Sequence, residues 1–240
     1  LASITVPLGA QFATGDTWTT EQLPEVISQV LAVIFFIGAG NTMNDFKDVE
    51  IDRDAHPDRP LASGSITLDN ARRFVYVLWT LSVTCVLIGA YFLHVDGKSP
   101  VELIAIYATA VTLMTTYDHG PTLKNTGLKG NISISIMVGA VILYGASSVG
   151  NLWTPLVWWT AALVFFANLA REIIKDCQDM EADEGNRTTL PMTYGLVKSR
   201  MLAYVIVMAA LVCLYIPYWK GPFDFNQLIF QTPAILMLIT

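Results

Sequence analysis

Two segments of the sequence combine carboxylates and amides at a spacing suited to binding a cation. The first segment contains Asn41, Asn44, Asp45, Asp48 and Asp52. At roughly 100° per residue, these three aspartates and two amides fall on one face of a helix. The sequence therefore predicts a helical face rich in oxygen donors, which is unusual unless something positively charged lies against it.

The second segment repeats this pattern farther along the chain. Asp176, Asp179 and Asp183 follow the same i, i+3, i+7 spacing, and Glu172 joins them on one predicted face. Like charges at this spacing repel each other, and carboxylates near hydrocarbon cost several kcal/mol unless they are compensated. We therefore expect a cation between the two acidic stripes. Oxygen ligands without His or Cys favour Mg²⁺ or another hard cation.

Basic residues flank both stripes, and they indicate what the cation would bind besides protein. Mg²⁺ retains waters and is readily completed by substrate phosphate oxygens. The flanking cations are Arg53, Arg59, Lys124, Lys175 and Arg187. Acids and bases around one cavity are typical of a metal–diphosphate site. The alternative is that the stripes are solvated helix ends with ordinary surface charge. That alternative would account for one stripe more readily than for two stripes with the same spacing.

The composition indicates which elements must position these residues. Of 240 residues, 53% are hydrophobic and only 14% are charged, whereas a soluble domain carries about 25% charged residues. The mean hydropathy is +0.50. A net charge of −6 argues against nucleic-acid binding. The sequence predicts an all-α, multi-span transmembrane bundle, and we expect one domain over residues 1–240 with incomplete ends.

Apolar runs define the expected spans. A transmembrane helix needs about 20 mostly apolar residues, and lipid leaves no other way to satisfy its backbone groups. Two half-spans are expected at 1–12 and 227–240. The full predicted spans cover residues 25–43, 73–93, 100–117, 131–149, 152–171 and 201–218.

The connecting segments predict the orientation. The long polar loops are 44–72, 118–130 and 171–200, and with the adjoining helix ends they hold all but two of the 14 Lys and Arg residues. The exceptions are Lys98 and Lys220. By the positive-inside rule, the long loops are cytoplasmic. Both acidic stripes therefore belong to a predicted cytoplasmic polar cap over a central cavity.

At this point the chain resembles the UbiA superfamily of intramembrane prenyltransferases. The family's N-D-x-x-D-x-x-x-D motif is matched by Asn44, Asp45, Asp48 and Asp52. Its R-P-L-x-S-G motif is matched by Arg59–Gly64, and Asp176, Asp179 and Asp183 match the second acidic motif, which Thr189-Leu190-Pro191 follows. A central family pattern is matched by Tyr117, Leu123-Lys124 and Gly130-Asn131.

The resemblance implies a fold of nine helices, of which this sequence represents about eight. It also implies that the protein lies in the cell membrane, in contact with membrane lipid. It implies transfer of a polyprenyl group from a prenyl diphosphate donor to a lipophilic acceptor, with Mg²⁺, expected as two ions, one for each stripe. The metal ligands it implies are Asn44, Asp45, Asp48, Asp52, Asp176, Asp179 and Asp183. The diphosphate-binding residues it implies are Arg59, Lys124, Lys175, Asn131, Arg53 and Arg187.

Further roles follow from the same resemblance. The residues expected to be catalytic are Asp48, Asp52, Asp179, Asp183, Lys124 and Tyr117, and the supporting residues are Asn41, Arg171 and Glu172. Tyr117 would contact phosphate or the allylic cation. The segment Arg171–Asp176 looks like the archaeal digeranylgeranylglyceryl phosphate synthase branch, which implies geranylgeranyl diphosphate as donor and geranylgeranylglyceryl phosphate as acceptor.

Three alternatives stay open. The first is a prenyltransferase with an aromatic acceptor, as in quinone pathways. The second is a cation-coupled transporter, but a transporter usually places its ionisable groups near the bilayer midplane, whereas these acids gather at one end of the spans. The third is a non-catalytic member of the same fold, against which the intact acidic stripes argue.

Overall fold

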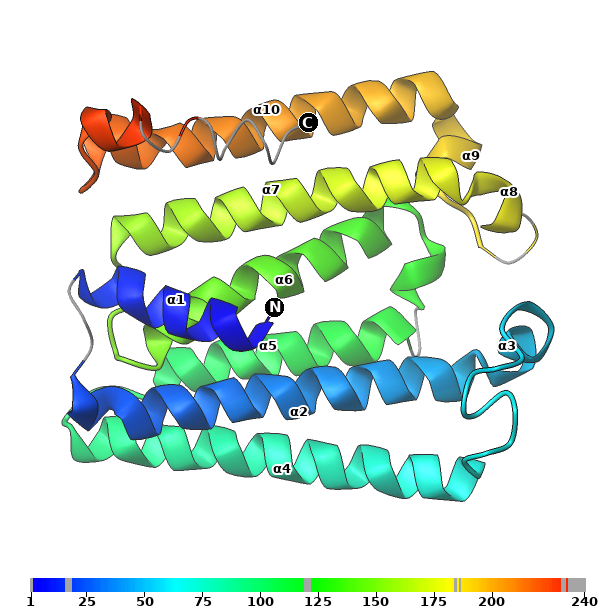
Figure 1. Ribbon diagram of the computed structural model, residues 1–240, viewed down its shortest axis with the longest axis horizontal. Helices are drawn as coiled ribbons and strands as arrows, with labels where there is room; N and C mark the ends of the chain where they lie inside the picture. Colours follow the sequence, from blue (N-terminus) through cyan, green and yellow to red (C-terminus); the bar gives the residue numbers. More distant parts are fainter. Residues whose placement is uncertain are drawn as a thin grey trace. The chain divides into compact units, whose positions relative to one another are not determined.

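The computed structural model describes residues 2–15, 19–118, 122–183, 185, 187–229 and 232 (Figure 1). Within these ranges the regular elements are helices, and the one β contact is an isolated parallel bridge between Thr126 and Thr188. The all-helical fold class is therefore confirmed. The contacts within the chain divide the protein into two compact units. Unit 1 is Leu1–Met114 with Tyr144–Asn151, and unit 2 is Thr115–Leu143 with Leu152–Thr240. The central cavity under a polar cap stays a prediction.

Each full predicted span corresponds to one helix. Five of these helices are long and apolar enough to cross a membrane, and the sixth, α5, is a shorter apolar helix. The helices are α2 (Leu23–Lys47), α4 (Leu68–Val95), α5 (Val101–Asp118), α6 (Leu128–Ser147), α7 (Pro155–Gln178) and α10 (Leu196–Lys220). The half-span at 1–12 corresponds to α1 (Ala2–Thr14), whereas the one at 227–240 lies mostly outside the described residues.

Short helices connect the long ones, and local sequence explains where several begin. Proline occupies the first turn of α2 and of α7, where its missing N–H has no intrahelical partner to lose. Thr67 caps α4, and its side chain accepts a bond of 3.3 Å from the Asn70 N–H. The short elements are η1 (Thr20–Gln22), α3 (Val49–Ala55), η2 (Leu123–Asn125), α8 (Met180–Asp183) and α9 (Leu190–Tyr194).

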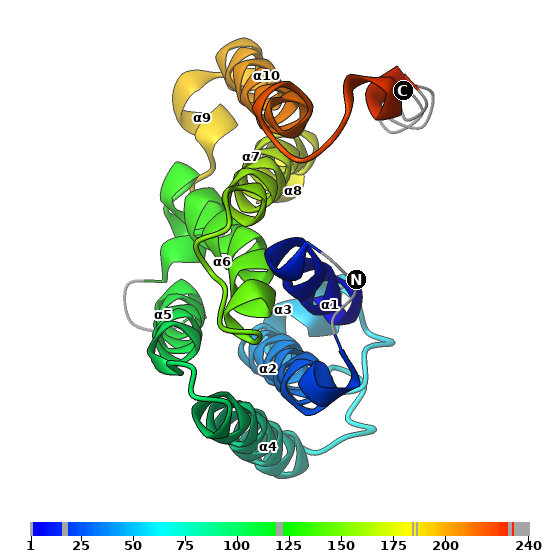
Figure 2. The same cartoon turned by 90° about the vertical axis from the view of Figure 1, so that its left-hand side faces the viewer.

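In unit 1, α2 and α4 lie side by side along their lengths (Figures 1 and 2). A buried hydrogen bond joins this pair, as is common between membrane helices. Ser82 Oγ donates to the Ala32 carbonyl at 2.8 Å. A Cβ atom at Gly89 would lie 1.7 Å from Gln29 Nε2, and Tyr144 Oη donates to Gln29 Oε1. Glycine at 89 is therefore what lets the buried Gln29 amide fit between the helices.

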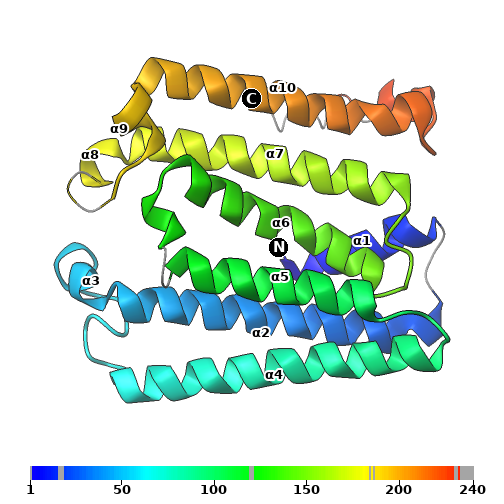
Figure 3. The ribbon, with the colours of Figure 1, turned by 180° about the vertical axis from the view of Figure 1, so that it is seen from behind.

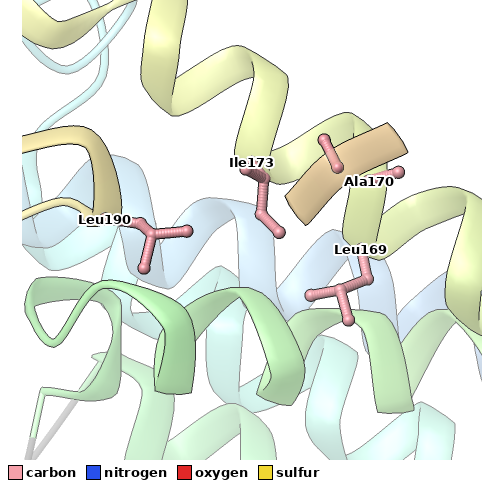
Figure 4. Close-up of a cluster of buried hydrophobic side chains, with 5 residues drawn as sticks. Leu169, Ala170, Ile173 and Leu190 are labelled. Carbon is pink, nitrogen blue, oxygen red and sulfur yellow. The ribbon is translucent and has the colours of Figure 1, made fainter. Parts of the chain in front are cut away.

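In unit 2, α7 packs along α10, with α8 and α9 at the same end of this pair (Figure 3). The apolar core at that end consists of Leu169, Ala170, Ile173, Leu190 and Ala203, all buried (Figure 4). Leu190 comes from α9, so this cluster holds α9 against the long helices α7 and α10.

Candidate active site

The first acidic group, defined as Asp45, Asp48 and Asp52, lies where α2 ends and α3 begins. Asp48 has φ −89° and ψ 6° and separates the two helices, so the predicted continuous helix is interrupted there. The Asp48 N–H still bonds the Asn44 carbonyl at 2.9 Å, and the Asp52 N–H bonds the Asp48 carbonyl at 2.8 Å. The aspartates therefore keep a helical register across the interruption.

Arg59 compensates the first acidic group. Its Nη1 lies 2.9 Å from Asp52 Oδ1, 2.8 Å from Asp52 Oδ2 and 3.8 Å from Asp45 Oδ1. The Asp52 side chain is only 7% exposed, whereas that of Arg59 is 44% exposed. The bond with Asp52 raises the pKa of Arg59 above its ordinary value, and the charges of Asp45 and Asp48 add to this. A buried carboxylate needs such a partner.

The other residues predicted on the first segment are Arg53, Asn41 and Asn44. Arg53 Nη1 pairs with Glu50 at 2.8 Å, and both side chains are exposed, so Arg53 pairs with an acid outside the first acidic group. Asn44 is half-buried and Asn41 is exposed. Of the two cations predicted on this segment, Arg59 is thus the one that the structure brings to the aspartates.

The second acidic group, defined as Asp176, Asp179 and Asp183, has the same backbone form. Asp179 has φ −91° and ψ 7° and separates α7 from α8. The Asp179 N–H bonds the Lys175 carbonyl, and the Asp183 N–H bonds the Asp179 carbonyl, both at 2.9 Å. Each acidic group is therefore two helical pieces joined at its middle aspartate.

Asn131 compensates the second acidic group from α6. Its Nδ2 donates to Asp176 Oδ2 at 2.8 Å, and both residues are buried. Ser135 Oγ donates to the Asn131 carbonyl at 2.6 Å and accepts from Asn168 Nδ2 at 3.1 Å. Asn131 was predicted to bind diphosphate, and its bond with Asp176 was missed. The available signal was its position within an apolar span, where a buried amide needs a polar partner.

Arg187 pairs with the far end of the second acidic group. Its Nη2 lies 2.7 Å from Asp183 Oδ2, which is an ion-pair distance. Burial opposes the charge on Arg187, but the pairing with Asp183 outweighs it, so the pKa of Arg187 is raised. Asp176 and Tyr117 also interact electrostatically with Arg187. The structure thus gathers four predicted site residues here.

The remaining predicted residues of unit 2 lie on η2 and on the end of α7. Lys124 lies in η2 and is half-buried, and Lys175 is exposed on the last turn of α7. Arg171 Nη1 lies 2.5 Å from Glu172 Oε1, so the two predicted supporting residues pair with each other.

The donor chemistry of each acidic group fits Mg²⁺. Among the residues that the structure describes, no three His, Cys, Asp or Glu side chains lie close enough to hold a metal ion by themselves. Mg²⁺ is typically bound through one or two carboxylates and completed by water and substrate phosphates. Each acidic group, with an arginine beside it, provides such an incomplete oxygen set.

Sequence comparison finds named relatives of this chain. Digeranylgeranylglyceryl phosphate synthase of Methanopyrus kandleri is 32% identical over 215 residues, which covers 89% of this chain and 74% of that protein. The enzyme of the same name from Methanoculleus marisnigri is 31% identical over 226 residues, covering 93% of this chain and 75% of that protein.

Two solved structures share the fold. One, determined in work on digeranylgeranylglyceryl phosphate synthase in membranes, has a TM-score of 0.77 and 26% identity, and covers 99% of this chain and 79% of the other. A UbiA homolog from Archaeoglobus fulgidus bound to GPP and Mg²⁺ has a TM-score of 0.73 and 16% identity, covering 99% and 80% of the two chains.

A family model describes almost the whole chain. The model of the UbiA prenyltransferase family matches residues 3–239, which include both acidic groups and their cationic partners. The enzyme class predicted from the motifs is confirmed by this match and by the named synthases. The chain therefore belongs to the UbiA prenyltransferase family, as a multi-pass membrane enzyme that transfers prenyl groups.

Proposed function

We propose that this chain transfers the geranylgeranyl group of geranylgeranyl diphosphate to geranylgeranylglyceryl phosphate, in archaeal ether-lipid synthesis. The names of its relatives support this substrate pair. The observation that carries the proposal is the pair of acidic groups with matching backbone form, each with an arginine at a buried or half-buried aspartate.

In this proposal the reaction needs both groups, with one Mg²⁺ held by each. Bound Mg²⁺ neutralises negative charge that develops on the departing diphosphate. Its proposed ligands are Asn44, Asp45, Asp48 and Asp52 in unit 1, and Asp176, Asp179 and Asp183 in unit 2. Asn131 would fix the orientation of Asp176, because its amide donates to one of the two carboxylate oxygens.

Cationic residues bind the diphosphate in this proposal. The residues proposed to form charge-assisted hydrogen bonds with phosphate oxygens are Arg59, Lys124, Lys175 and Arg187. Arg53 is placed lower because its acidic partner, Glu50, lies outside the first acidic group, whereas Arg59 and Arg187 each pair with an aspartate of an acidic group. Tyr117 hydrogen-bonds phosphate or faces the allylic cation that departure of diphosphate leaves behind. Exclusion of water protects that cation until the acceptor hydroxyl attacks it. An aspartate takes the hydroxyl proton, which completes the ether.

The acidic groups are proposed to lie at the cytoplasmic side of the membrane. The distribution of Lys and Arg supports this orientation, since all but Lys98 and Lys220 of the 14 belong to the long polar loops and adjoining helix ends. The orientation is tested by introducing a single cysteine at Asp58 or at Asp224 and labelling it in sealed vesicles. We expect the two cysteines to react with reagent supplied from opposite sides of the membrane.

The substrate pair is tested by identifying the product. Purified protein receives geranylgeranyl diphosphate with either geranylgeranylglyceryl phosphate or an aromatic acid, and mass spectrometry identifies the product. We expect the ether lipid alone, with none from an Asp179→Asn control. A prenylated aromatic acid instead would replace the proposed acceptor, and absence of either product would contradict the proposed function.

Metal removal tests the cofactor. Excess chelator is expected to stop transfer, and added Mg²⁺ is expected to restore it, because the diphosphate leaves poorly without a neutralising cation. The measurement is initial rate against free Mg²⁺ concentration. Full activity in excess chelator would contradict the metal role of both acidic groups.

A further inference from the structure

The segment that precedes α6 is folded as a tight turn around Lys124. The Asn125 N–H bonds the Thr122 carbonyl at 2.9 Å, and Thr126 Oγ1 donates to the Leu123 carbonyl at 2.7 Å. Thr122 has φ 45°, a conformation that β-branched residues rarely adopt and that is often found at functional sites. The backbone around Lys124 is therefore tightly determined.

This turn rests directly on the first turn of α6. A Cβ atom at Gly130 would lie 2.6 Å from the Leu123 carbonyl oxygen and 3.2 Å from Lys124 Cα. Glycine at 130 thus allows backbone-to-backbone contact between η2 and α6. Asn131, which bonds Asp176, is the next residue, so the Lys124 turn and the second acidic group share one support.

The turn is joined to the segment after Arg187 by a contact that we name the loop clasp: Thr126 and Gly127 against Thr188–Leu190. Thr126 forms its parallel bridge with Thr188. Gly127 has φ 59°, and a Cβ atom there would lie 3.3 Å from both the Leu190 nitrogen and the Thr188 oxygen. Gly127 therefore supplies both the left-handed conformation and the space that the loop clasp needs.

The loop clasp lies between two cations along the backbone. Lys124 comes shortly before Thr126, and Arg187 directly precedes Thr188. Arg187 is itself held by Asp183 at 2.7 Å, and the neighbouring Leu190 is anchored in the apolar core of unit 2 (Figure 4). A fixed bridge between the two segments fixes the separation of the two cations' backbones.

We infer that Gly127 is a positioning residue, which closes the loop clasp so that Lys124 and Arg187 grip the donor diphosphate together. The inference rests on the proposed function, because that proposal assigns both cations to the diphosphate. It adds that their cooperation depends on a backbone contact made by residues that touch no substrate. Preorganised donors of this kind lose much of their effect when displaced by about 1 Å.

Gly127→Ala tests the inference, with Gly97→Ala as the control. Gly97, between α4 and α5, also has positive φ, 72°, but nothing lies within 4 Å of its would-be Cβ, so the control carries the backbone strain without a clash. A Cβ atom at 3.3 Å shifts its neighbours by only a few tenths of an ångström, so for Gly127→Ala we expect kcat/KM for geranylgeranyl diphosphate to fall about threefold or more. Inhibition by inorganic pyrophosphate should weaken similarly, with the KM for the acceptor unchanged.

A second variant keeps the inference testable if the Gly127→Ala protein does not fold. Thr188→Gly adds no atoms and loosens the bridge, and it is expected to weaken pyrophosphate inhibition in the same direction by about threefold or more. Thermal unfolding of all variants identifies any that fail to fold. A folded Thr188→Gly protein with unaltered pyrophosphate inhibition, together with a Gly127→Ala protein no worse than Gly97→Ala, would overturn the inference.

Coupling between the two sites gives the sharpest test. Lys124→Ala is made in the wild-type and in the Thr188→Gly background, and kcat/KM for the donor is measured in each. We expect Lys124→Ala to cost several-fold less in the loosened background, because its ammonium is no longer held in place. Equal losses in both backgrounds contradict positioning of Lys124. Failure of the proposed function is distinguishable, since wild-type protein would then form no ether lipid.

Discussion

The first and second acidic groups differ in which aspartate is buried and in what compensates it. In the first group the last aspartate, Asp52, is buried, and its partner Arg59 comes from the loop that follows in the same stretch of chain. In the second group the first aspartate, Asp176, is buried, and its partner Asn131 comes from α6, 45 positions earlier.

This contrast separates a locally folded group from one that depends on tertiary packing. The Arg59 pair forms within one loop and keeps a half-exposed guanidinium. The Asn131 bond exists only because α6 packs against α7, and it is continued by Ser135 and Asn168. We expect substitutions in the first group to act mainly by removing an electrostatic interaction. Substitutions in the second group are expected to destabilise the packing of unit 2 as well.

The largest expected effect tests whether the two groups are equivalent in catalysis. Asp48→Asn and Asp179→Asn alter the middle aspartate of each group and are each expected to lower kcat at least about 100-fold, because charge on the leaving diphosphate is no longer neutralised. Steady-state kinetics and thermal unfolding are measured together. Glu50→Gln and Glu181→Gln, both at exposed acids beside the groups, serve as controls.

If only one of the two aspartate variants lost activity, the groups would not be equivalent. Full activity in both variants would contradict the metal role altogether. Equal losses in the glutamate controls would instead indicate a general effect of surface charge rather than a role of specific ligands.

The next prediction concerns stability and a smaller effect, at the residue that packs against the second acidic group. Asn131→Ala removes the amide donor to Asp176 and is expected to lower the free energy of unfolding by about 1–3 kcal/mol, because a buried acceptor loses its partner. Chemical denaturation in detergent provides the measurement. Asn41→Ala, at an exposed amide of the first segment, should change stability by less than about 0.5 kcal/mol. Similar effects of the two variants would erase the contrast between the groups.

The smallest expected effect concerns the local pair. Arg59→Ala leaves Asp52 without its ion-pair partner, and we expect a loss of about 1–2 kcal/mol, moderated because the guanidinium is 44% exposed. Arg53→Ala breaks an exposed pair and should cost less than about 0.5 kcal/mol. The same denaturation assay compares them. A larger loss for Arg53→Ala would refute the assignment of Arg59 as the compensating cation.

The helices were predictable because membrane spans leave a long apolar signal. All the full spans appear as helices, and several extend past the predicted ends; α7, for example, runs to Gln178 rather than residue 171. The apolar pattern marks only the part suited to hydrocarbon, whereas helical hydrogen bonding continues into the polar loops. The spacing of the acidic residues was likewise readable, since it depends on neighbours in the sequence.

The partners of the buried aspartates were not predictable. Asn131 and Asp176 are brought together by the packing of α6 on α7, which no local pattern encodes. Arg59 was assigned to diphosphate by motif, but its contact with Asp52 depends on the path of the loop after α3. The interruptions at Asp48 and Asp179 were missed because a projection at roughly 100° per residue assumes an unbroken helix.

The interruption at the middle aspartate divides each group between two helices. The first aspartate of each group belongs to a long apolar helix, α2 or α7, whereas the last belongs to α3 or α8, which are only 7 and 4 residues long. The backbone angles of Asp48 and Asp179 therefore set the distance between the first and the last carboxylate of each group. A substitution that alters either joint changes the spacing of the oxygen donors even where it leaves every carboxylate in place.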